Sequence, residues 1–113
     1  MTTLPTDPQE LNRLYNETVD HHKAYLEKVH QAFDRRCEEI RVEAHKKFDT
    51  MPESDQAGRQ KVLAEEKAEL DQALSELKQT IQKSSQDARK KLEEIEAKIE
   101  TDALNLEKTL TTV

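Results

Sequence analysis

The sequence predicts an all-α fold, namely a long antiparallel helical hairpin with helices at about residues 8–50 and 52–111. Charged residues make up 37% of the chain and aromatic residues only 4%, which is typical of long solvated helices. Gly58 is the only glycine, and few other turn residues are present, whereas a β fold needs a turn about every 8–12 residues. Apolar residues recur at helical spacing throughout, so these observations together favour helices over disorder.

Two proline-containing segments mark where the helices are expected to begin. In "TDPQEL" Asp7 is a candidate N-cap and Pro8 fits the first helical position. In "DTMPESDQ" Pro52 is suited to open the second helix, and Ser54 with Asp55 offers another possible cap. With 113 residues the chain is expected to be a single helical domain, residues 1–113, that starts with a flexible tail at residues 1–6.

The first helix carries an inward stripe that repeats every 11 residues. An 11-residue repeat gives about 3.67 residues per turn, so the stripe stays nearly straight along the helix. Its members are Leu11, Tyr15, Thr18, His22, Leu26, Val29, Phe33, Cys37, Ile40, Ala44, Phe48 and Met51.

The stripe of the second helix reads as heptads interrupted by four-residue steps. Such interruptions relax a left-handed supercoil, so both stripes predict nearly straight helices packed side by side. The members of this second stripe are Leu63, Leu70, Leu74, Leu77, Ile81, Ser85, Ala88, Leu92, Ile95, Ile99, Ala103, Leu106, Leu110 and Val113.

The second helix is predicted to be longer than the first, and its excess length carries apolar residues. If the chain turns at residues 50–52, the first helix covers the second only to about residue 95. We expect the residues beyond this point to form the interface of a homo-oligomer, with a dimer favoured and the hairpins associating into a bundle. These residues are Ile99, Leu106, Leu110 and Val113. The alternative is a break near residues 83–87 that folds the chain into a three-helix bundle.

All four histidines and the only cysteine lie on the first helix, but their spacing argues against a metal site. His22 and Cys37 belong to the stripe and stand about 22 Å apart along a helix, whereas zinc ligands lie about 2.0–2.3 Å from one ion. His21, His30 and His45 fall on its flanks. The sequence therefore predicts no metal site and no cofactor, and Cys37 reads as a small buried apolar residue.

Four polar residues interrupt the two stripes at similar heights of the hairpin. Thr18, His22, Ser84 and Ser85 are expected to meet in one polar layer of an otherwise apolar seam, with Thr18 level with Ser84. Buried polar residues of this kind fix the register of coiled coils, and we give the layer that role.

Function is predicted to be non-enzymatic, since no phosphate-binding loop or nucleophile–base arrangement is apparent. The net charge of −6 argues against nucleic acid and anionic membranes as partners. The lack of a signal peptide and the single cysteine suggest a cytoplasmic protein. The sequence thus favours a helical interaction or scaffold protein that self-associates and binds a protein partner. The alternative is an amphipathic helical protein that coats a lipid or polymer surface.

Overall fold

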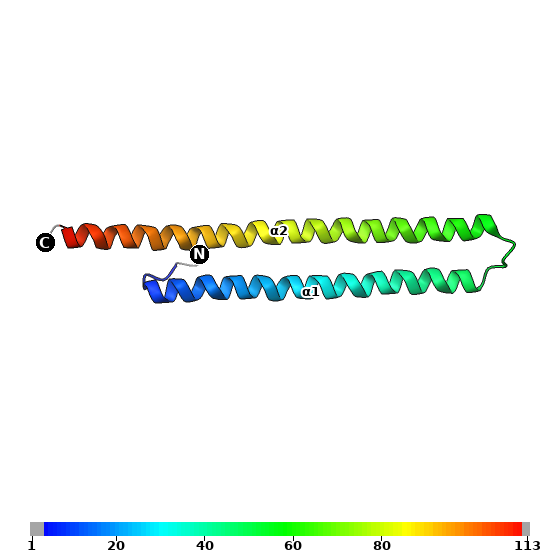
Figure 1. Ribbon diagram of the computed structural model, residues 1–113, viewed down its shortest axis with the longest axis horizontal. Coiled ribbons are helices and arrows are strands. Elements are labelled where there is room, and N and C mark those ends of the chain that lie inside the picture. Colours follow the sequence, from blue (N-terminus) through cyan, green and yellow to red (C-terminus); the bar gives the residue numbers. More distant parts are fainter. Residues whose placement is uncertain (1–3, 112–113) are drawn as a thin grey trace. The chain divides into compact units, whose positions relative to one another are not determined.

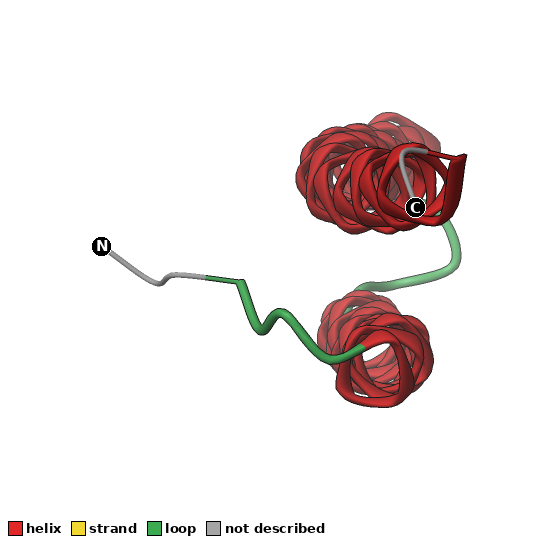
Figure 2. Ribbon diagram, turned by 90° about the vertical axis from the view of Figure 1, so that its left-hand side faces the viewer, coloured by secondary structure: helices red, strands yellow, loops and turns green. Residues whose placement is uncertain are grey.

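The computed structural model describes residues 4–111, which form two helices and the segments beside them (Figures 1 and 2). Helix α1 spans Pro8–Asp49 and helix α2 spans Gln56–Thr111, and residues 4–111 contain no strand. The predicted all-α helical hairpin is therefore confirmed. Two compact units are present, and each contains part of α1 and part of α2 running antiparallel. Unit 1 comprises Met1–Tyr25 and Gln82–Val113, and unit 2 comprises Leu26–Ile81.

Helix α1 begins where the sequence predicts. The Asp7 carboxylate accepts a hydrogen bond from the backbone N–H of Gln9 at 3.0 Å, which satisfies one of the N–H groups that the first turn leaves free. Pro8 occupies the first helical position, where its missing N–H costs nothing. The prediction of Asp7 as N-cap is confirmed.

Helix α2 begins at Gln56, four residues later than the predicted start at Pro52. Asp55 is its N-cap, because the carboxylate accepts the N–H of Gly58 at 2.9 Å. Pro52 lies in the connecting loop, where its carbonyl accepts the N–H of Asp55 at 3.0 Å. Proline fits a tight turn as well as a first helical turn, so Pro52 alone did not locate the helix start.

The break expected in the alternative three-helix bundle does not occur. Residues 83–87 are helical, and α2 continues through them to Thr111. Ser84 and Ser85 are therefore interior helix residues and cap nothing. The three-helix alternative is wrong because this stretch contains no glycine or proline to open the helix.

Unit 2 has a narrow core of small and branched side chains that lies between the two helices. The buried side chains are Cys37, Ile40 and Ala44 of α1 together with Val62 and Ala73 of α2. Ion pairs bridge the helices beside this core, between Arg36 and Glu76 and between Lys47 and Glu65. All four of these charged side chains are about half exposed, so packing of the small core residues stabilises the unit more than the ion pairs do.

Unit 1 is anchored by two side chains with no exposed surface, Leu11 of α1 and Ile95 of α2. Thr18 is also buried, at 7% exposure, and Ala88 and Leu92 are half-buried. Deleting a fully buried leucine or isoleucine side chain costs about 2–5 kcal/mol of folding free energy, so this pair dominates the stability of the unit.

The contact face of α1 matches the predicted stripe, since its eleven members on this helix are all buried or half-buried, and the twelfth, Met51, is half-buried in the loop. The contact face of α2 differs from its predicted stripe. Leu63 and Leu74 are 53% and 40% exposed, while their neighbours Val62 and Ala73 are buried. The buried positions of α2 are Val62, Ala73 and Ile95, which are 11 and 22 residues apart, and the half-buried Ser84 lies midway in the longer interval.

The reason for this difference is geometric. A helix that packs against a straight partner must present a face of the same period, and the period of α1 is 11 residues. Heptad spacing would rotate the contact face of α2 away from α1 along its length. The predicted stripe of α2 therefore fails at Leu63, Leu74 and Ser85, which are exposed beside the seam, whereas its other members up to Ile99 are buried or half-buried.

Candidate functional site

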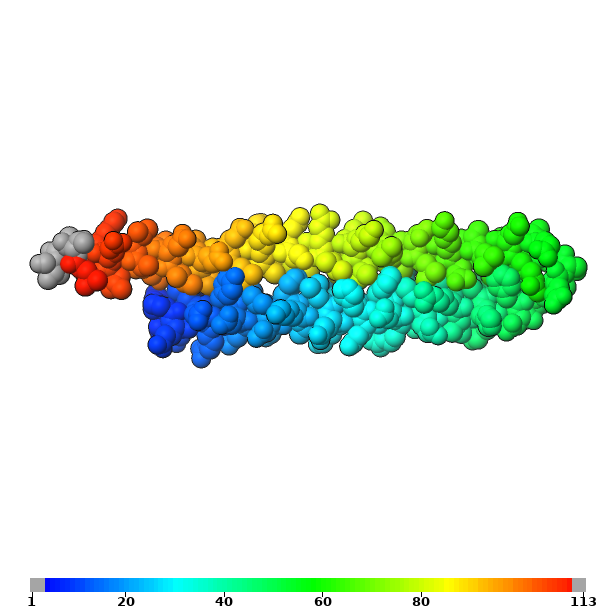
Figure 3. Space-filling view, in the orientation of Figure 1, coloured from blue at the N-terminus to red at the C-terminus, as the bar shows by residue number. Residues whose placement is uncertain are grey.

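The C-terminal end of α2 extends past the beginning of α1 in unit 1 (Figures 1 and 3). The hydrogen bond between His22 and Ser84 places these residues opposite each other. Counting 14 residues from this pair along both helices brings Pro8, the first residue of α1, opposite Lys98. Residues 99–111 of α2 thus lie beyond the residue that faces Pro8, three residues later than the sequence predicted, and residues 103–110 are all exposed.

The predicted interface residues lie on this overhanging segment or at its start. Leu106 and Leu110 are 63% and 70% exposed, and Ile99 is half-buried beside the first turn of α1. Val113 lies outside the described residues. At about 100° per residue, Ile99, Ala103, Leu106 and Leu110 form one face of the helix, which we call the terminal face. Leu104 is 57% exposed but lies well to one side of this face.

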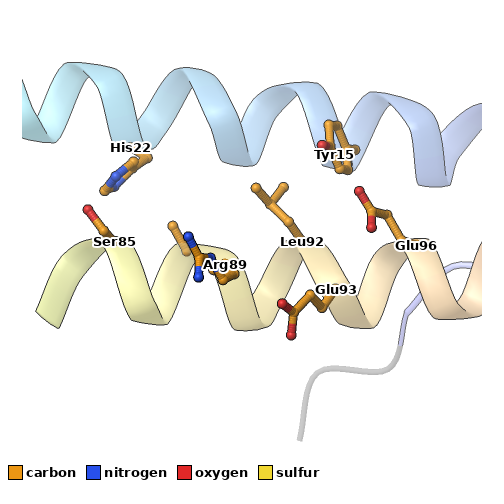
Figure 4. A pocket seen from close by; sticks show the side chains of 8 residues that line it. Tyr15, His22, Ser85, Arg89, Leu92, Glu93 and Glu96 are labelled. Carbon is orange, nitrogen blue, oxygen red and sulfur yellow. The ribbon is translucent and has the colours of Figure 1, made fainter. Parts of the chain in front are cut away.

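The four residues of the predicted polar layer are only partly brought together. His22 and Ser84 meet, with 3.1 Å between the imidazole Nδ1 and the serine Oγ. Ser85 is exposed on the neighbouring side of α2, and its side chain is directed toward His22 in Figure 4. Thr18 does not join them. Its hydroxyl donates to the carbonyl of Leu14 in its own helix at 2.7 Å.

Thr18 is displaced from the layer because the loop is longer than expected. The prediction placed Thr18 level with Ser84, but the later start of α2 shifts the pairing by about one helical turn. His22 therefore occupies the place opposite Ser84, and Thr18 faces the level of Ala88. Bonding to the carbonyl four residues back is the usual way for a buried helical threonine to satisfy its hydroxyl.

A groove of about 400 Å³ opens beside His22 (Figure 4). Tyr15 and His22 of α1 form one wall, and residues of α2 form the other. The α2 wall consists of Ser85, Ala88, Arg89, Leu92, Glu93 and Glu96. The groove is therefore amphipathic, since its lining includes the apolar Ala88 and Leu92 together with one cation and two carboxylates.

The arrangement of these groups does not favour chemistry on a substrate. His22 and Ser84 are within hydrogen-bond reach, as a base and a nucleophile would be. Both residues lie inside helices, however, where the backbone N–H groups are bound within the helix and cannot stabilise an oxyanion. The pair instead satisfies two polar side chains on the contact face between the helices.

The remaining histidines and the cysteine are separated as the sequence predicted. His21, His30 and His45 are exposed, and Cys37 is buried at 7% exposure. A ring nitrogen of His30 lies 2.9 Å from the carbonyl oxygen of Leu26, one turn earlier in α1. Among residues 4–111, no group of three or more histidine, cysteine or acidic side chains is placed to hold a metal ion.

Neither described helix has a segment apolar enough to cross a membrane. Comparison of the chain with protein-family models, with curated proteins and with solved structures found no match.

Proposed function

We propose that this chain is a non-enzymatic helical interaction protein that self-associates through the terminal face of α2 and binds a protein partner. The observation that carries this proposal is the exposure of Leu106 and Leu110 on a helical segment that α1 does not cover. The face that packs against α1 at Ile95 continues into the terminal face without interruption.

The energetics of the overhanging segment support self-association. An isolated helix shorter than about 12–15 residues is marginal in water, and residues 103–110 of α2 are all exposed. Full burial of a leucine side chain is worth about 1.5–3 kcal/mol. Covering Leu106 and Leu110 would therefore stabilise both the segment and the complex that covers it.

The charged surfaces support a role in binding rather than in catalysis. Charged residues are 37% of the chain, and the groove beside His22 is shallow and lined by charges of both signs. Adaptors and assembly scaffolds combine a self-associating helical seam with charged outer faces in this way. The single buried Cys37 fits a protein of a reducing compartment such as the cytoplasm.

Sedimentation equilibrium of three proteins tests self-association. The wild-type chain is expected to form dimers at tens of micromolar, and Leu106→Glu is expected to be monomeric because it puts a charge on the terminal face. Leu104→Glu is the matched control, since it adds the same charge to the same helix away from that face. A monomeric wild type, or a control that dissociates as readily as Leu106→Glu, would contradict the proposal.

Affinity purification of wild type from the native host, followed by mass spectrometry, tests the partner. The proposal expects a specific protein that is retained at about 150 mM salt. Co-sedimentation with lipid vesicles in place of protein capture would support the coating function instead.

A further inference from the structure

We infer that the occupant of the terminal face is a second copy of this chain, bound antiparallel so that Ala103 of each copy faces Leu106 of the other. This inference rests on the proposed function and specifies the partner and the geometry of the same surface. Four features of unit 1 support this antiparallel pairing.

The first feature is the complementarity of the terminal face with itself. In antiparallel pairing about a two-fold axis, Ile99 faces Leu110 of the second copy and Ala103 faces Leu106. The two-fold axis repeats each of these two residue pairs, so each pair occurs twice in the dimer. The small Ala103 side chain leaves room for the large Leu106 side chain, which is how facing helix surfaces interdigitate.

The second feature is the length of the overhang. When Ile99 faces Leu110 of the second copy, Thr111 of that copy reaches the level of Lys98, opposite Pro8. The described part of the second copy's α2 then reaches the level of the first residue of α1, so residues 99–111 are long enough for this pairing.

The third feature is the polarity of the helix ends that meet there. The first turn of α1 carries the partial positive charge of a helix N-terminus, and the last turn of α2 carries the partial negative charge of a helix C-terminus. Antiparallel pairing sets these opposite ends next to each other at both ends of the interface. A parallel arrangement of the two α2 segments would place neither end beside α1.

The fourth feature is that the described N-terminal residues turn away from the terminal face. Leu4 and Pro5 are half-buried and line a groove of about 300 Å³ together with Leu14 and Lys91. Lys91 precedes the overhang by two helical turns. Residues 4 and 5 therefore lie along the paired part of unit 1, and neither of them lines the terminal face.

The charges beside the face make a specific prediction about affinity. In this pairing Glu100 lies beside Glu107 of the second copy. By the two-fold symmetry, Glu107 of the first copy also lies beside Glu100 of the second. Two like-charge contacts weaken the dimer, so moderate salt is expected to strengthen it by screening. Glu100→Lys turns both contacts into attractions, and we expect it to lower the dissociation constant about 5- to 20-fold.

Glu94→Lys is the matched control for that gain. It changes the net charge of the chain equally, but residue 94 lies on the side of α2 opposite the terminal face. Its dissociation constant is expected to stay within about twofold of wild type. An equal gain in both variants would assign the effect to net charge and overturn the pairing.

Disulfide trapping tests the geometry directly in full-length chains that carry Cys37→Ala. Ala103→Cys and Leu106→Cys are prepared separately, at about 200 μM, and oxidised in a glutathione redox buffer. Antiparallel pairing predicts little cross-linking in either sample alone and a cross-linked heterodimer when the two are mixed. Cross-linking within each separate sample, and none between them, would overturn the inference.

The two proposals fail in distinguishable ways. A wild type that dimerises, without the mixed cross-link and without tightening by Glu100→Lys, overturns the antiparallel pairing and leaves self-association standing. A wild type that stays monomeric at about 200 μM overturns both.

Discussion

The hydrogen bond between His22 and Ser84 joins α1 to α2 through two polar side chains on the contact face of unit 1. Removing one partner of a partly buried hydrogen bond costs about 0.5–1.5 kcal/mol of folding free energy, because the remaining polar group loses its hydrogen-bond partner. The bond is specific to one register of the helices, since a shift by one residue would separate the two side chains.

We predict that Ser84→Ala lowers the free energy of unfolding by about 0.5–1.5 kcal/mol. Urea denaturation followed by circular dichroism measures this loss. Ser85→Ala is the control, because Ser85 is exposed and its loss is expected to cost under about 0.5 kcal/mol. If His22→Leu alters neither stability nor oligomeric state, the register role of this pair is wrong.

The cap of α2 gives a second residue-scale prediction. Asp55→Ala removes the acceptor of the Gly58 N–H and is expected to destabilise the chain by about 1 kcal/mol. Asp55→Asn keeps an acceptor at this position and is expected to retain most of the stability. Thermal melting of both variants checks the assignment, and an equal loss in the two would contradict capping by the side chain.

At the scale of the elements, the common 11-residue period of α1 and α2 explains which apolar residues are enclosed. Val62 is 5% exposed and Leu63 is 53% exposed, although leucine is the larger apolar residue. Burial on α2 is therefore set by the face that α1 presents and not by the hydrophobicity of single residues.

This assignment predicts unequal effects of two adjacent truncations. Val62→Ala removes buried methyl groups and is expected to cost about 1–2.5 kcal/mol of folding free energy. Leu63→Ala removes a larger side chain but is expected to cost less than about 1 kcal/mol, because that side chain is half in water. A greater loss for Leu63→Ala would restore the heptad interpretation.

The sequence predicted α1 better than α2, for physical reasons. The stripe of α1 has aromatic and branched residues at consistent spacing, so its period is unambiguous. In α2 leucines occur on two adjacent faces, and only contact with α1 decides between Val62 and Leu63 or between Ala73 and Leu74. The sequence placed Thr18 opposite Ser84 instead of opposite Ala88. This pairing depends on where α2 starts, and both Pro52 and Asp55 are suitable starts.

The sequence did not predict a groove beside His22. His22 and Ser85 were identified as polar stripe residues, but Arg89, Glu93 and Glu96 looked like ordinary solvated positions. Their place in one groove with Tyr15 and His22 follows from the pairing of the two helices, and Glu96 is the one directed toward Tyr15 (Figure 4). The i,i+4 and i,i+7 spacing of residues 85, 89, 92 and 96 was the available signal.

At the scale of the whole molecule, the two helices differ in length, and the longer helix extends past the shorter one. Helix α2 has 56 residues and α1 has 42, and the excess carries the terminal face. The apolar stripe that stabilises the helix pair continues onto this face, where Leu106 and Leu110 are exposed. We propose that assembly with a second copy covers this face.

Amide hydrogen exchange of the wild-type chain at several concentrations tests this central claim most directly. In the monomer, residues 103–110 are exposed, so the amides of the segment 99–111 are expected to exchange rapidly. Between about 5 and 200 μM their protection is expected to rise with concentration, while the amides near Leu11 and Ile95 stay protected throughout. Protection of residues 99–111 that is absent or unchanged across this range would contradict coverage of the terminal face by a second copy.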